Sequence, residues 1–520
     1  MKKIISLGLA AVLSVGMLAG CGGLEGSDKV AVEGNAKYAA SDKPITAKIF
    51  LMTGNTGAFN AEEWKIFQKA AELTNVTLEG VTSSSNTDAT SAYNLMMASG
   101  EVADIIGTDK KNIEKYIDQG VYIDLTDLID KHAPNIKKFL DENPDMKKGA
   151  TYLDGKMYFV PFMMDGKAAT GWYIRKDWLK KLNLEEPKTV DELYTVMKAF
   201  KEQDPNGNGK ADEIPYFQRG KVVTDLYSLF GVRMNWHVND EGKVVYGQYT
   251  PEFKNAVENV AKWYKEGLID REIYTRSQNA RNYALQENIG GVTHDWFTST
   301  STFNSLLAPT IEGFDFSPIV PPADINGKSW EPGSRDISAN SGWGISSLCE
   351  NPEAMIKYMD FWFTEEGSLL ANFGIEGENW TMVDGKPTFT EKMFEGEETV
   401  VQKLWKIGAQ VPSGMGYKQN YWYEEQTLDE DVQQAIRTYI DGGYIIDQFP
   451  QIAFTAEEQK VIDSKLPAIQ TFISETEQQW IMGSKDVTTS FDDYMKSLKD
   501  MGIEDVVEVY NKAYQRYIKE

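Results

Sequence analysis

The loop at residues 204–213 carries the residue types that bind a hard cation. It reads Asp-Pro-Asn-Gly-Asn-Gly-Lys-Ala-Asp-Glu, so side-chain oxygens stand at its positions 1, 3, 5, 9 and 10. Lys210, at position 7, can offer its backbone carbonyl. Gly207 and Gly209 permit a tight turn that points these oxygens inward. Calcium takes about six to eight oxygen ligands in such a loop. The sequence therefore predicts a structural calcium site here.

The same loop has a second interpretation. An EF-hand would carry a bidentate Glu at position 12, where this chain has Pro215. A polar turn of Gly and Asn residues between a helix and a strand would also produce this composition. The alternating oxygens favour calcium, in a loop that is EF-like without being an EF-hand.

Tryptophan is the residue that most suggests a ligand. The chain has 13 Trp residues, and several have Gly, Asn or Asp beside them in loop-like settings. The flat apolar faces of sugars pack on such rings while nearby carboxylates and amides bind the hydroxyls. Trp64 and Trp362 lie on helical stripes and are expected in the core. Trp296 and Trp380 have polar neighbours and no helical periodicity, which favours a cleft.

Residues for catalysis are few. His132, His237 and His294 lie far apart and show no metal-ligand spacing, and the sequence contains neither a Gly-x-Ser-x-Gly elbow nor a P-loop. We therefore expect no enzyme. Two carboxylates that face each other across a cleft need no particular spacing, so a cell-tethered glycosidase or lyase remains the alternative.

The elements that must position these residues alternate between strand and helix patterns. Residues 47–52 read as a strand, Asn60 as the start of a helix, and Val76 as the start of a second strand. A helix over residues 91–99 and a strand over 102–106 follow. This βαβαβ order predicts an α/β fold with a parallel sheet and covering helices.

Clear helix signals continue along the chain. Thr189 with Glu192 forms a capping box, and Thr250 before Pro251 opens another helix. Asn351 before a proline opens a third, which we expect to end at Gly367. The part after about Thr399 is rich in helical patterns and aromatic residues.

The size, net charge and cysteine content of the chain narrow the range of functions that it can have. The 520 residues correspond to about three domain equivalents or to two large lobes, and the composition is that of a globular protein. The net charge of −25 argues against nucleic acid and polyphosphate partners. Cys349 lies in an apolar setting and is expected to be a buried small hydrophobic residue.

The N-terminus has the order of an export signal. Lys2 and Lys3 precede an apolar stretch, from Ile4 to Leu18, that is too short to span a bilayer comfortably. The Leu-Ala-Gly-Cys ending resembles the lipobox of bacterial lipoproteins, which implies cleavage before Cys21 and a diacylglycerol on its sulfur. An ordinary secretory signal, or a buried helix with an accidental cysteine, is the alternative. Residues 21–43 are expected to be a flexible tether.

Several segments in shared order resemble one family, the large bacterial extracellular solute-binding proteins of the LipO and alginate-oligosaccharide-binding type. These are lipoprotein components of carbohydrate ABC importers. The segments are residues 93–100 with 103–106, 173–179 leading into the Asp204 loop, 264–270, 351–354, and 364–368 with 374–377.

The resemblance implies a type II periplasmic-binding-protein fold, with two α/β lobes around a ligand cleft and a hinge that the chain crosses more than once. We expect residues 1–20 to form the signal peptide and residues 21–43 the tether. Lobe 1 would begin with residues 44–160 and lobe 2 with residues 161–280. The chain would return to lobe 1 over residues 281–340 and complete lobe 2 over residues 341–520. The implied calcium ligands are Asp204, Asn206, Asn208, Lys210, Asp212 and Glu213.

The implied function is capture of a carbohydrate, in the form of an oligosaccharide, on the outer face of a Gram-positive cell membrane. The partners would be the transmembrane permease subunits of an ABC importer, with membrane contact through the lipid only and the protein itself a monomer. A surface lipoprotein that binds a peptide is a third hypothesis. The ligand-binding candidates are Asn55, Trp172, Trp236, Asp295, Trp296, Arg335 and Trp380. Arg335 is included because an acidic sugar needs a cation, although a surface salt bridge would also explain it.

Overall fold

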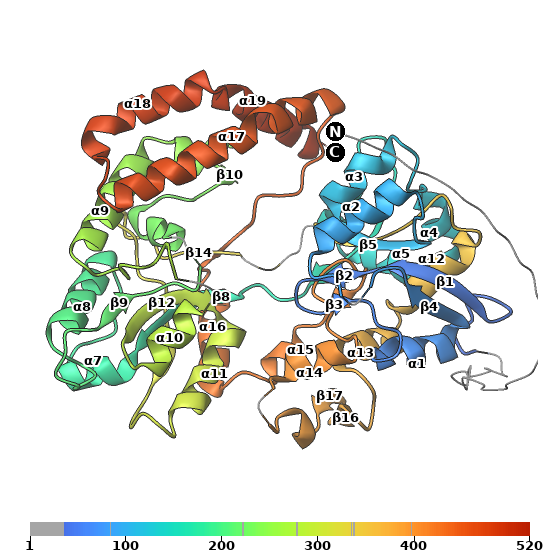
Figure 1. Cartoon of the computed structure of the whole chain (residues 1–520), viewed down its shortest axis with the longest axis horizontal. Helices are drawn as coiled ribbons and strands as arrows, with labels where there is room; N and C mark the ends of the chain where they lie inside the picture. The colour runs from blue at the N-terminus through green and yellow to red at the C-terminus, as the bar shows by residue number, and fades with distance from the viewer. Residues whose placement is uncertain are drawn as a thin grey trace, which may run out of the picture. The chain divides into compact units, whose positions relative to one another are not determined.

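The computed structural model describes residues 36–83, 85–220, 223–276, 279–333, 335, 339–396 and 398–519 (Figure 1). The predicted signal peptide and the lipidation candidate Cys21 lie outside the described residues. In the described part of the chain, no helix combines the length and the apolar character that crossing a bilayer requires.

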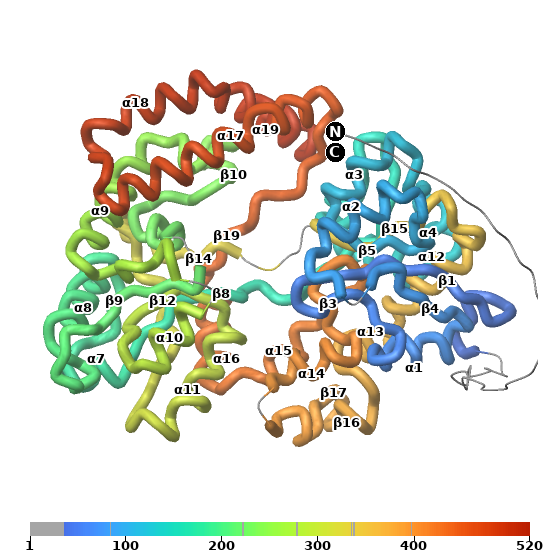
Figure 2. Tube along the Cα trace, in the orientation of Figure 1, coloured from blue at the N-terminus to red at the C-terminus, as the bar shows by residue number. Residues whose placement is uncertain are grey.

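The first sheet has five strands in the order β4–β1–β5–β15–β6. Strand β1 pairs in parallel with both β4 and β5, which confirms the parallel sheet predicted from the βαβαβ pattern. Strand β15 joins antiparallel to β5 and β6, although more than two hundred residues separate it from β5 (Figure 2). The strands are β1 (Ile45–Phe50), β4 (Val76–Gly80), β5 (Ile105–Asp109), β6 (Val160–Pro161) and β15 (Ser341–Ile345).

Helices and short strands surround this sheet. Their bounds are β2 (Met52–Thr53), β3 (Gly57–Ala58), α1 (Lys65–Thr74), α2 (Ala89–Ser99), α3 (Lys110–Ile117), α4 (Thr126–His132), α5 (Pro134–Glu142), α6 (Pro144–Ala150), β7 (Met163–Met164), α12 (Pro352–Phe361), α13 (Glu365–Phe373), β16 (Trp380–Val383), β17 (Lys386–Phe389), η3 (Glu391–Met393), α14 (Val400–Lys406), β18 (Lys418–Gln419) and α15 (Trp422–Glu425).

Two predicted boundaries in this region are wrong. Helix α1 begins at Lys65, because the side chain of Asn60 instead accepts the backbone N–H groups of Glu62 and Glu63 in a turn. Gly367 does not end a helix. It lies in the first turn of α13, where its N–H donates to the capping hydroxyl of Thr364.

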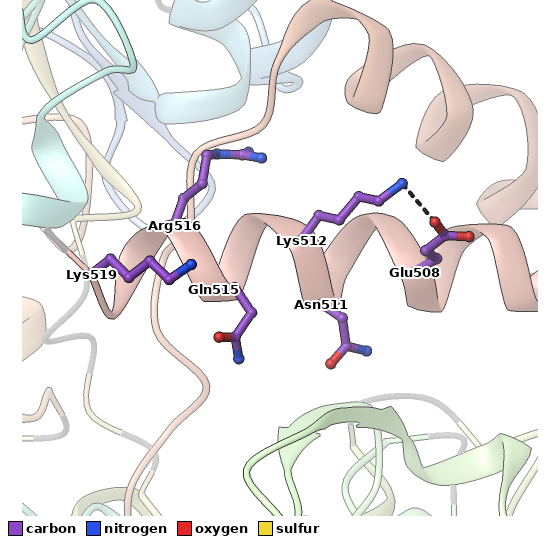
Figure 3. A pocket seen from close by; sticks show the side chains of 6 residues that line it. All are labelled: Glu508, Asn511, Lys512, Gln515, Arg516 and Lys519. Carbon is purple, nitrogen blue, oxygen red and sulfur yellow. Dashed lines mark ion pairs between the residues drawn. The ribbon is translucent and has the colours of Figure 1, made fainter.

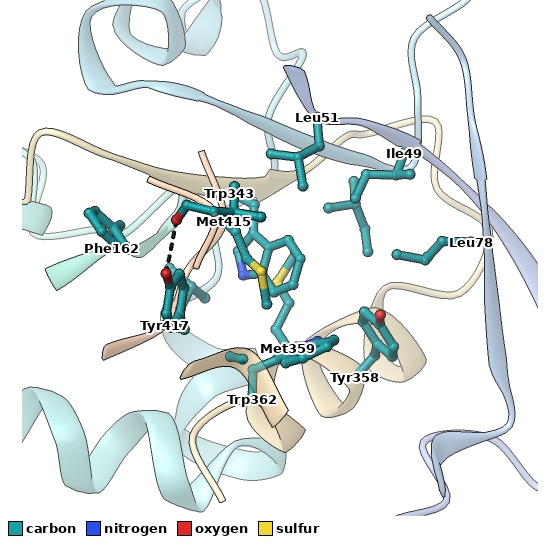
Figure 4. Packing of buried hydrophobic residues seen from close by; sticks show 14 of the residues in the cluster. Ile49, Leu51, Leu78, Phe162, Trp343, Tyr358, Met359, Trp362, Met415 and Tyr417 are labelled. Atoms are coloured by element: carbon teal, nitrogen blue, oxygen red, sulfur yellow. Dashed lines mark hydrogen bonds between the residues drawn. The ribbon is translucent and has the colours of Figure 1, made fainter. Parts of the chain in front are cut away.

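The first core contains the tryptophans expected there. Trp64 and Trp362 are buried, and Trp343 of β15 packs among Ile49, Met359 and the neighbouring apolar side chains of Figure 4. The tether predicted to reach residue 43 is shorter. Tyr38 packs against Phe361, and the backbone N–H of Ala40 donates to Thr74, so the chain joins the fold from about residue 38.

The second sheet has four strands in the order β13–β8–β12–β9. Strand β12 is antiparallel to β8 and parallel to β9, and β13 is antiparallel to β8. The bounds are β8 (Thr170–Arg175), β9 (Ile214–Tyr216), β12 (Gly290–Trp296) and β13 (Phe316–Ile319).

The elements around the second sheet include the predicted helices at 190 and 252. Helix α9 buries Phe253, Val257 and Val260, as its stripe predicts. The bounds are α7 (Lys176–Leu182), α8 (Val190–Glu202), η1 (Thr224–Phe230), β10 (Trp236–Val238), β11 (Val244–Tyr246), η2 (Gly247–Tyr249), α9 (Glu252–Lys265), α10 (Ala280–Gln286), α11 (Phe297–Leu307), β14 (Glu331–Pro332), α16 (Glu430–Asp441), β19 (Ile445–Ile446), α17 (Ala456–Ile481), α18 (Val487–Asp500) and α19 (Ile503–Tyr517).

Two of the ranges predicted for the lobes are wrong, because the strands they contain belong to the other sheet. Residues 281–340 were expected with the first sheet, yet they supply β12 and β13 to the second. Residues 341–423 were expected with the second sheet, yet β15 enters the first sheet and the following helices pack in the first core. Gly342 explains why β15 fits there, because a Cβ at this position would lie 2.1 Å from the Val160 carbonyl oxygen of the neighbouring strand.

The chain crosses between the two sheets three times, as Figure 2 traces. The crossovers run from β6 to β8, from β13 to β15, and from β18 to α16. A multiple crossing of this kind is the hinge that the resemblance implied.

A buried ion pair joins all three crossovers. Arg335 of the second crossover donates from Nη1 to Glu424 Oε2 of the third at 2.6 Å. Its Nη2 lies 3.5 Å from the carbonyl oxygen of Ala168 in the first. Both charged side chains are nearly inaccessible to solvent, and Thr298 donates a further hydrogen bond to Glu424.

Replacing Trp343 by Ala should lower the free energy of unfolding by about 3–5 kcal/mol, because a large side chain is removed from a fully buried site. Chemical denaturation followed by circular dichroism measures this. Met382→Ala is the matched control, since Met382 is exposed and its loss should change stability by less than about 0.5 kcal/mol. Equal effects of the two substitutions would contradict the packing described.

Replacing Glu424 by Gln should cost about 3–5 kcal/mol, because it leaves the Arg335 guanidinium buried without its carboxylate. Glu425→Gln is the control on the same short helix. Its carboxylate is partly exposed, 4.0 Å from Arg437, and should contribute less than about 1 kcal/mol. Adding Arg335→Met to Glu424→Gln should restore part of the loss, and a double variant less stable than Glu424→Gln alone would refute the pairing.

Candidate functional site

A cavity of about 360 Å³ lies beside the second sheet. Three aromatic side chains and a set of charged and amide groups line it, which is the usual composition of a small-molecule site. The lining residues are Thr224, Asp225, Ser228, Val232, Arg233, Met234, Asn235, Trp236, His294, Trp330, Pro332, Gly333, Asp447, Gln448 and Phe449. We call this cavity the Trp236 pocket.

The C-terminal helix α19 fixes the orientation of Trp236. The indole stacks on the ring of Tyr510, with centroids 3.7 Å apart and planes 10° apart. The next residue of α19, Asn511, accepts a hydrogen bond from the Val244 backbone N–H at 2.9 Å. Its side-chain amide donates to the Val244 carbonyl oxygen at 2.8 Å. The β10–β11 hairpin that carries Trp236 is therefore held against α19 by both stacking and hydrogen bonds.

The two other aromatic walls come from different segments. Trp330 stands just before β14, and its indole nitrogen lies 3.4 Å from Asp324 Oδ2. Phe449 follows β19 and packs between Tyr510 and Tyr514 of α19. Each ring is partly exposed and held by neighbours, so the walls are preformed.

A charged triad adjoins the pocket, and two of its residues, His294 and Asp225, line it. His294 of β12 bonds through Nε2 to Glu331 at 2.8 Å, and its Nδ1 lies 3.4 Å from Asp225 Oδ2. Burial lowers the pKa of His294, but the carboxylates of Glu331 and Asp225 outweigh it and hold the pKa well above its usual value. These carboxylates favour the imidazolium form of His294, which directs one ring N–H at each of them.

The hydrogen bonds of the triad orient its two carboxylates differently. Glu331 is buried, and its Oε1 also accepts from the Thr170 hydroxyl at 2.6 Å. Asp225 is partly exposed, and its Oδ2 accepts from Gln218 as well as facing His294. Asp225 lines the pocket, so its partly exposed carboxylate is an acceptor available there.

Of the seven ligand-binding candidates from the sequence, only Trp236 lines this pocket. Trp172 is 2% exposed and packs behind the pocket against His294, and Trp380 is 3% exposed with its indole donating to the Gly374 carbonyl. Neither ring has a free face for stacking on a sugar. Trp380 is therefore a core residue, contrary to our expectation.

The two charged ligand-binding candidates, Asp295 and Arg335, form ion pairs inside the protein. Asp295 is buried between Arg219 and Arg281, each 2.9 Å away. Arg335 forms the buried pair with Glu424, which corrects both the cleft role and the surface salt bridge considered for it. Asn55 is exposed in the turn between β2 and β3, and Trp296 precedes α11 with its backbone N–H bonded to Asp295. Neither lines the pocket.

Sequence reasoning missed most of the pocket. Asp225, Arg233, His294, Trp330 and Phe449 are brought together from four separate segments. The one available signal was Trp330 beside Glu331 and a proline, a polar-flanked aromatic residue of the kind that identified Trp236. The spacing of residues along the sequence gave no indication of the other lining residues, because contacts between distant segments determine where these side chains lie.

A second hollow, of about 450 Å³, lies along α19 (Figure 3). It is lined only by residues of this helix and its end, with Glu508 and Lys512 ion-paired at 2.6 Å. A depression bordered by one helix face does not enclose a ligand, so we assign it no site.

The loop at Asp204 follows α8 in a tight conformation. Asp204 has a left-handed φ of 47°, and Gly207 and Gly209 have φ of 73° and 75°. The carboxylate of Asp204 accepts from the backbone N–H groups of Asn208 and Gly209 at 3.1 and 3.0 Å. Side-chain amides of Asn206 and Asn208 donate to Asp212.

Glu213 is the unusual residue of this loop. Both of its carboxylate oxygens are buried and accept no hydrogen bond. Burial, followed by repulsion from Asp204 and Asp212, raises the pKa of Glu213. Within the described ranges, no three His, Cys, Asp or Glu side chains converge as a metal-binding group. The donor set suits a cation, and rotation of the two Asn amides would direct their oxygens inward.

Cys349 is half-buried at the edge of the first core, and burial raises the pKa of its thiol to about 11. A thiol with this pKa is a poor nucleophile at neutral pH. Cys349 was expected to be buried in an apolar setting, and the structure places it only partly inside the core.

Comparison with known proteins identifies the relatives. The chain is 27% identical to the fructooligosaccharide ABC transporter substrate-binding protein FusA of Streptococcus pneumoniae, over 97% of this chain and 96% of that protein. It is 26% identical to lipoprotein LipO of Bacillus subtilis, over 99% and 98% of the two chains. A crystal structure of the alginate-binding protein AlgQ2 without calcium ion matches with a TM-score of 0.82 and 37% identity, covering 92% of this chain and 100% of that one.

The model of the family described as bacterial extracellular solute-binding protein matches residues 53–368. This range includes strands of both sheets and two of the three crossovers. The two-sheet α/β architecture is therefore the periplasmic-binding-protein fold, and the chain belongs to the bacterial extracellular solute-binding protein family.

Proposed function

We propose that this protein captures an oligosaccharide in the Trp236 pocket and delivers it to an ABC importer. Support comes from the family and from relatives named for binding fructooligosaccharide and alginate. The observation that carries the proposal is the pocket itself, in which three fixed aromatic faces stand beside Asp225, Asn235 and Gln448. Sugar faces stack on the rings while the polar groups bind hydroxyls.

The pocket's carboxylates favour binding without chemistry. A glycosidase needs one carboxylic acid and one carboxylate, both free to reach the scissile bond. Glu331 is buried and engaged by His294 and Thr170, and Asp225 is held by His294 and Gln218. Neither of these carboxyl groups is arranged as a proton donor. Asp447, the other acidic residue of the lining, is exposed to solvent. The relatives compared above are likewise named as binding proteins or lipoproteins.

Delivery places the protein outside the cytoplasmic membrane. In this proposal Cys21 carries the lipid, and the segment that ends near residue 38 is the tether that lets the folded part reach the permease subunits. The three crossovers form the hinge through which ligand binding changes the arrangement recognised by the permease.

We also propose that the loop at 204–213 holds a structural calcium ion. The two buried, unpartnered oxygens of Glu213 support this, since a bound cation would satisfy them and relieve the repulsion from Asp204 and Asp212. Ligands would come from Asp204, Asn206, Asn208, Asp212 and Glu213 and from the Lys210 carbonyl. The site has no role in ligand capture, because none of these residues lines the Trp236 pocket.

Isothermal titration calorimetry with a panel of oligosaccharides should show stoichiometric binding, with no product detected after prolonged incubation. Trp236→Ala should weaken binding about 10- to 150-fold, as expected for losing about 1.5–3 kcal/mol of aromatic burial. Trp405→Ala is the control, since Trp405 is a partly exposed tryptophan of α14 outside the pocket.

Melting temperature and circular dichroism must show that Trp236→Ala still folds, because the indole also stacks on Tyr510. Release of shorter sugars would instead indicate a carbohydrate-active enzyme. Binding only of peptides would indicate another class of surface lipoprotein.

Removing calcium with EDTA should lower the melting temperature of the wild-type protein by several degrees, since a ligand that binds only the folded state stabilises it. Asp204→Ala should abolish this sensitivity. Asp240→Ala, in the exposed turn of the β10–β11 hairpin, should retain it. If the melting temperature is unchanged in EDTA, the loop is a simple turn that binds no calcium.

A further inference from the structure

We infer that the Trp236 pocket selects uncharged oligosaccharides and rejects those built from uronic acids, with Asp225 as the residue that determines this. The inference rests on the proposed function and extends it to the class of sugar. Relatives of this chain are named for both a neutral and an acidic oligosaccharide, so family membership leaves the choice open.

The arginines around the second sheet are already neutralised. Arg219 and Arg281 both bond to Asp295, each at 2.9 Å. Arg335 is paired with Glu424 at 2.6 Å. A sugar carboxylate is normally bound by an arginine fork that is free to receive it. These three guanidinium groups are committed to the protein's own carboxylates.

The pocket lining itself carries no surplus of positive charge. Arg233 donates to the backbone carbonyl of Asp447, and the Asp447 side chain lines the same cavity. His294 is held between the carboxylates of Asp225 and Glu331. The positive charge of His294 is thus offset by two carboxylates and that of Arg233 by the charge of Asp447, and the whole protein is strongly acidic.

Asp225 supplies the discriminating charge. Its Oδ2 is fixed by His294 and Gln218, and its partly exposed carboxylate belongs to the lining of the pocket. A carboxylate oxygen accepts a hydrogen bond from a sugar hydroxyl. The same oxygen repels a sugar carboxylate placed there, and a partly buried site strengthens that repulsion.

The test compares matched oligosaccharides that differ in charge. Neutral tetrasaccharides of fructose, glucose, galactose and mannose and acidic tetrasaccharides of galacturonate and mannuronate are titrated into the full chain at two salt concentrations. The best neutral ligand should bind at least 100-fold more tightly than the best acidic one. Its affinity should change little with salt, because no ion pair is formed.

Asp225→Asn keeps the shape of the side chain and removes its charge. This variant should bind the neutral ligand several-fold more weakly and should reduce the neutral-to-acidic affinity ratio at least 10-fold. A merely structural role for Asp225 would weaken both ligand classes equally and leave the ratio unchanged. Asp240→Asn, an exposed Asp outside the pocket, is the control and should leave the ratio as in the wild type.

The outcomes separate the two proposals. An acidic ligand that binds more tightly than every neutral one, with affinity that falls steeply as salt rises, would overturn this inference and leave oligosaccharide capture intact. An unchanged ratio in Asp225→Asn would overturn the role of Asp225. Failure of all the sugars, with binding of another ligand class, would overturn the proposed function itself.

Discussion

The ion pair between Arg335 and Glu424 is the interaction on which the connection between the two sheets depends. It ties the second crossover to the third, and the guanidinium also approaches Ala168 of the first. Two opposite charges taken out of water together are tolerated only when their geometry is good and further hydrogen bonds satisfy them. The three crossovers are therefore tied together at this one point, which any movement of the hinge must either keep or break.

The Trp236 pocket shows how this arrangement supports a site built from distant segments. Glu331 of β14 follows β13 on the second crossover and reaches His294 of β12, while β14 pairs with β19 near the start of the C-terminal helices. The charged triad therefore joins the crossover to the second sheet, and the aromatic walls on either side are fixed by α19 and by Asp324. Polar groups that are bonded to one another in this way are preorganised for a ligand.

The sequence predicted local features well and long-range placement poorly, for identifiable reasons. The parallel order of β1, β4 and β5 follows from a βαβαβ pattern in which neighbours in sequence are neighbours in space. Strand β15 carries the same apolar pattern as a strand of either sheet. The close approach of Gly342 to Val160 and of Gly344 to Tyr158, which a one-dimensional pattern does not reveal, favours its place in the first sheet.

The same distinction applies to the candidate site. Trp236 was identified by its polar neighbours, and so was Trp380, which is buried against Phe373. A polar residue next to a tryptophan in the sequence does not show whether another side chain covers the face of the indole ring in the folded protein. Asp295 and Arg335 have the chemistry of a ligand site, yet each is neutralised by a partner at least 14 residues away in sequence.

The stacking of Trp236 on Tyr510 has a consequence for how the affinity of the pocket can change. Tyr510 belongs to α19, a helix that lies far along the chain from the hairpin that carries Trp236. A displacement of α19 would move the ring that supports the indole, and the aromatic wall would change although no residue of the pocket lining is replaced. The grip on a solute is thus coupled to the packing of the C-terminal helices.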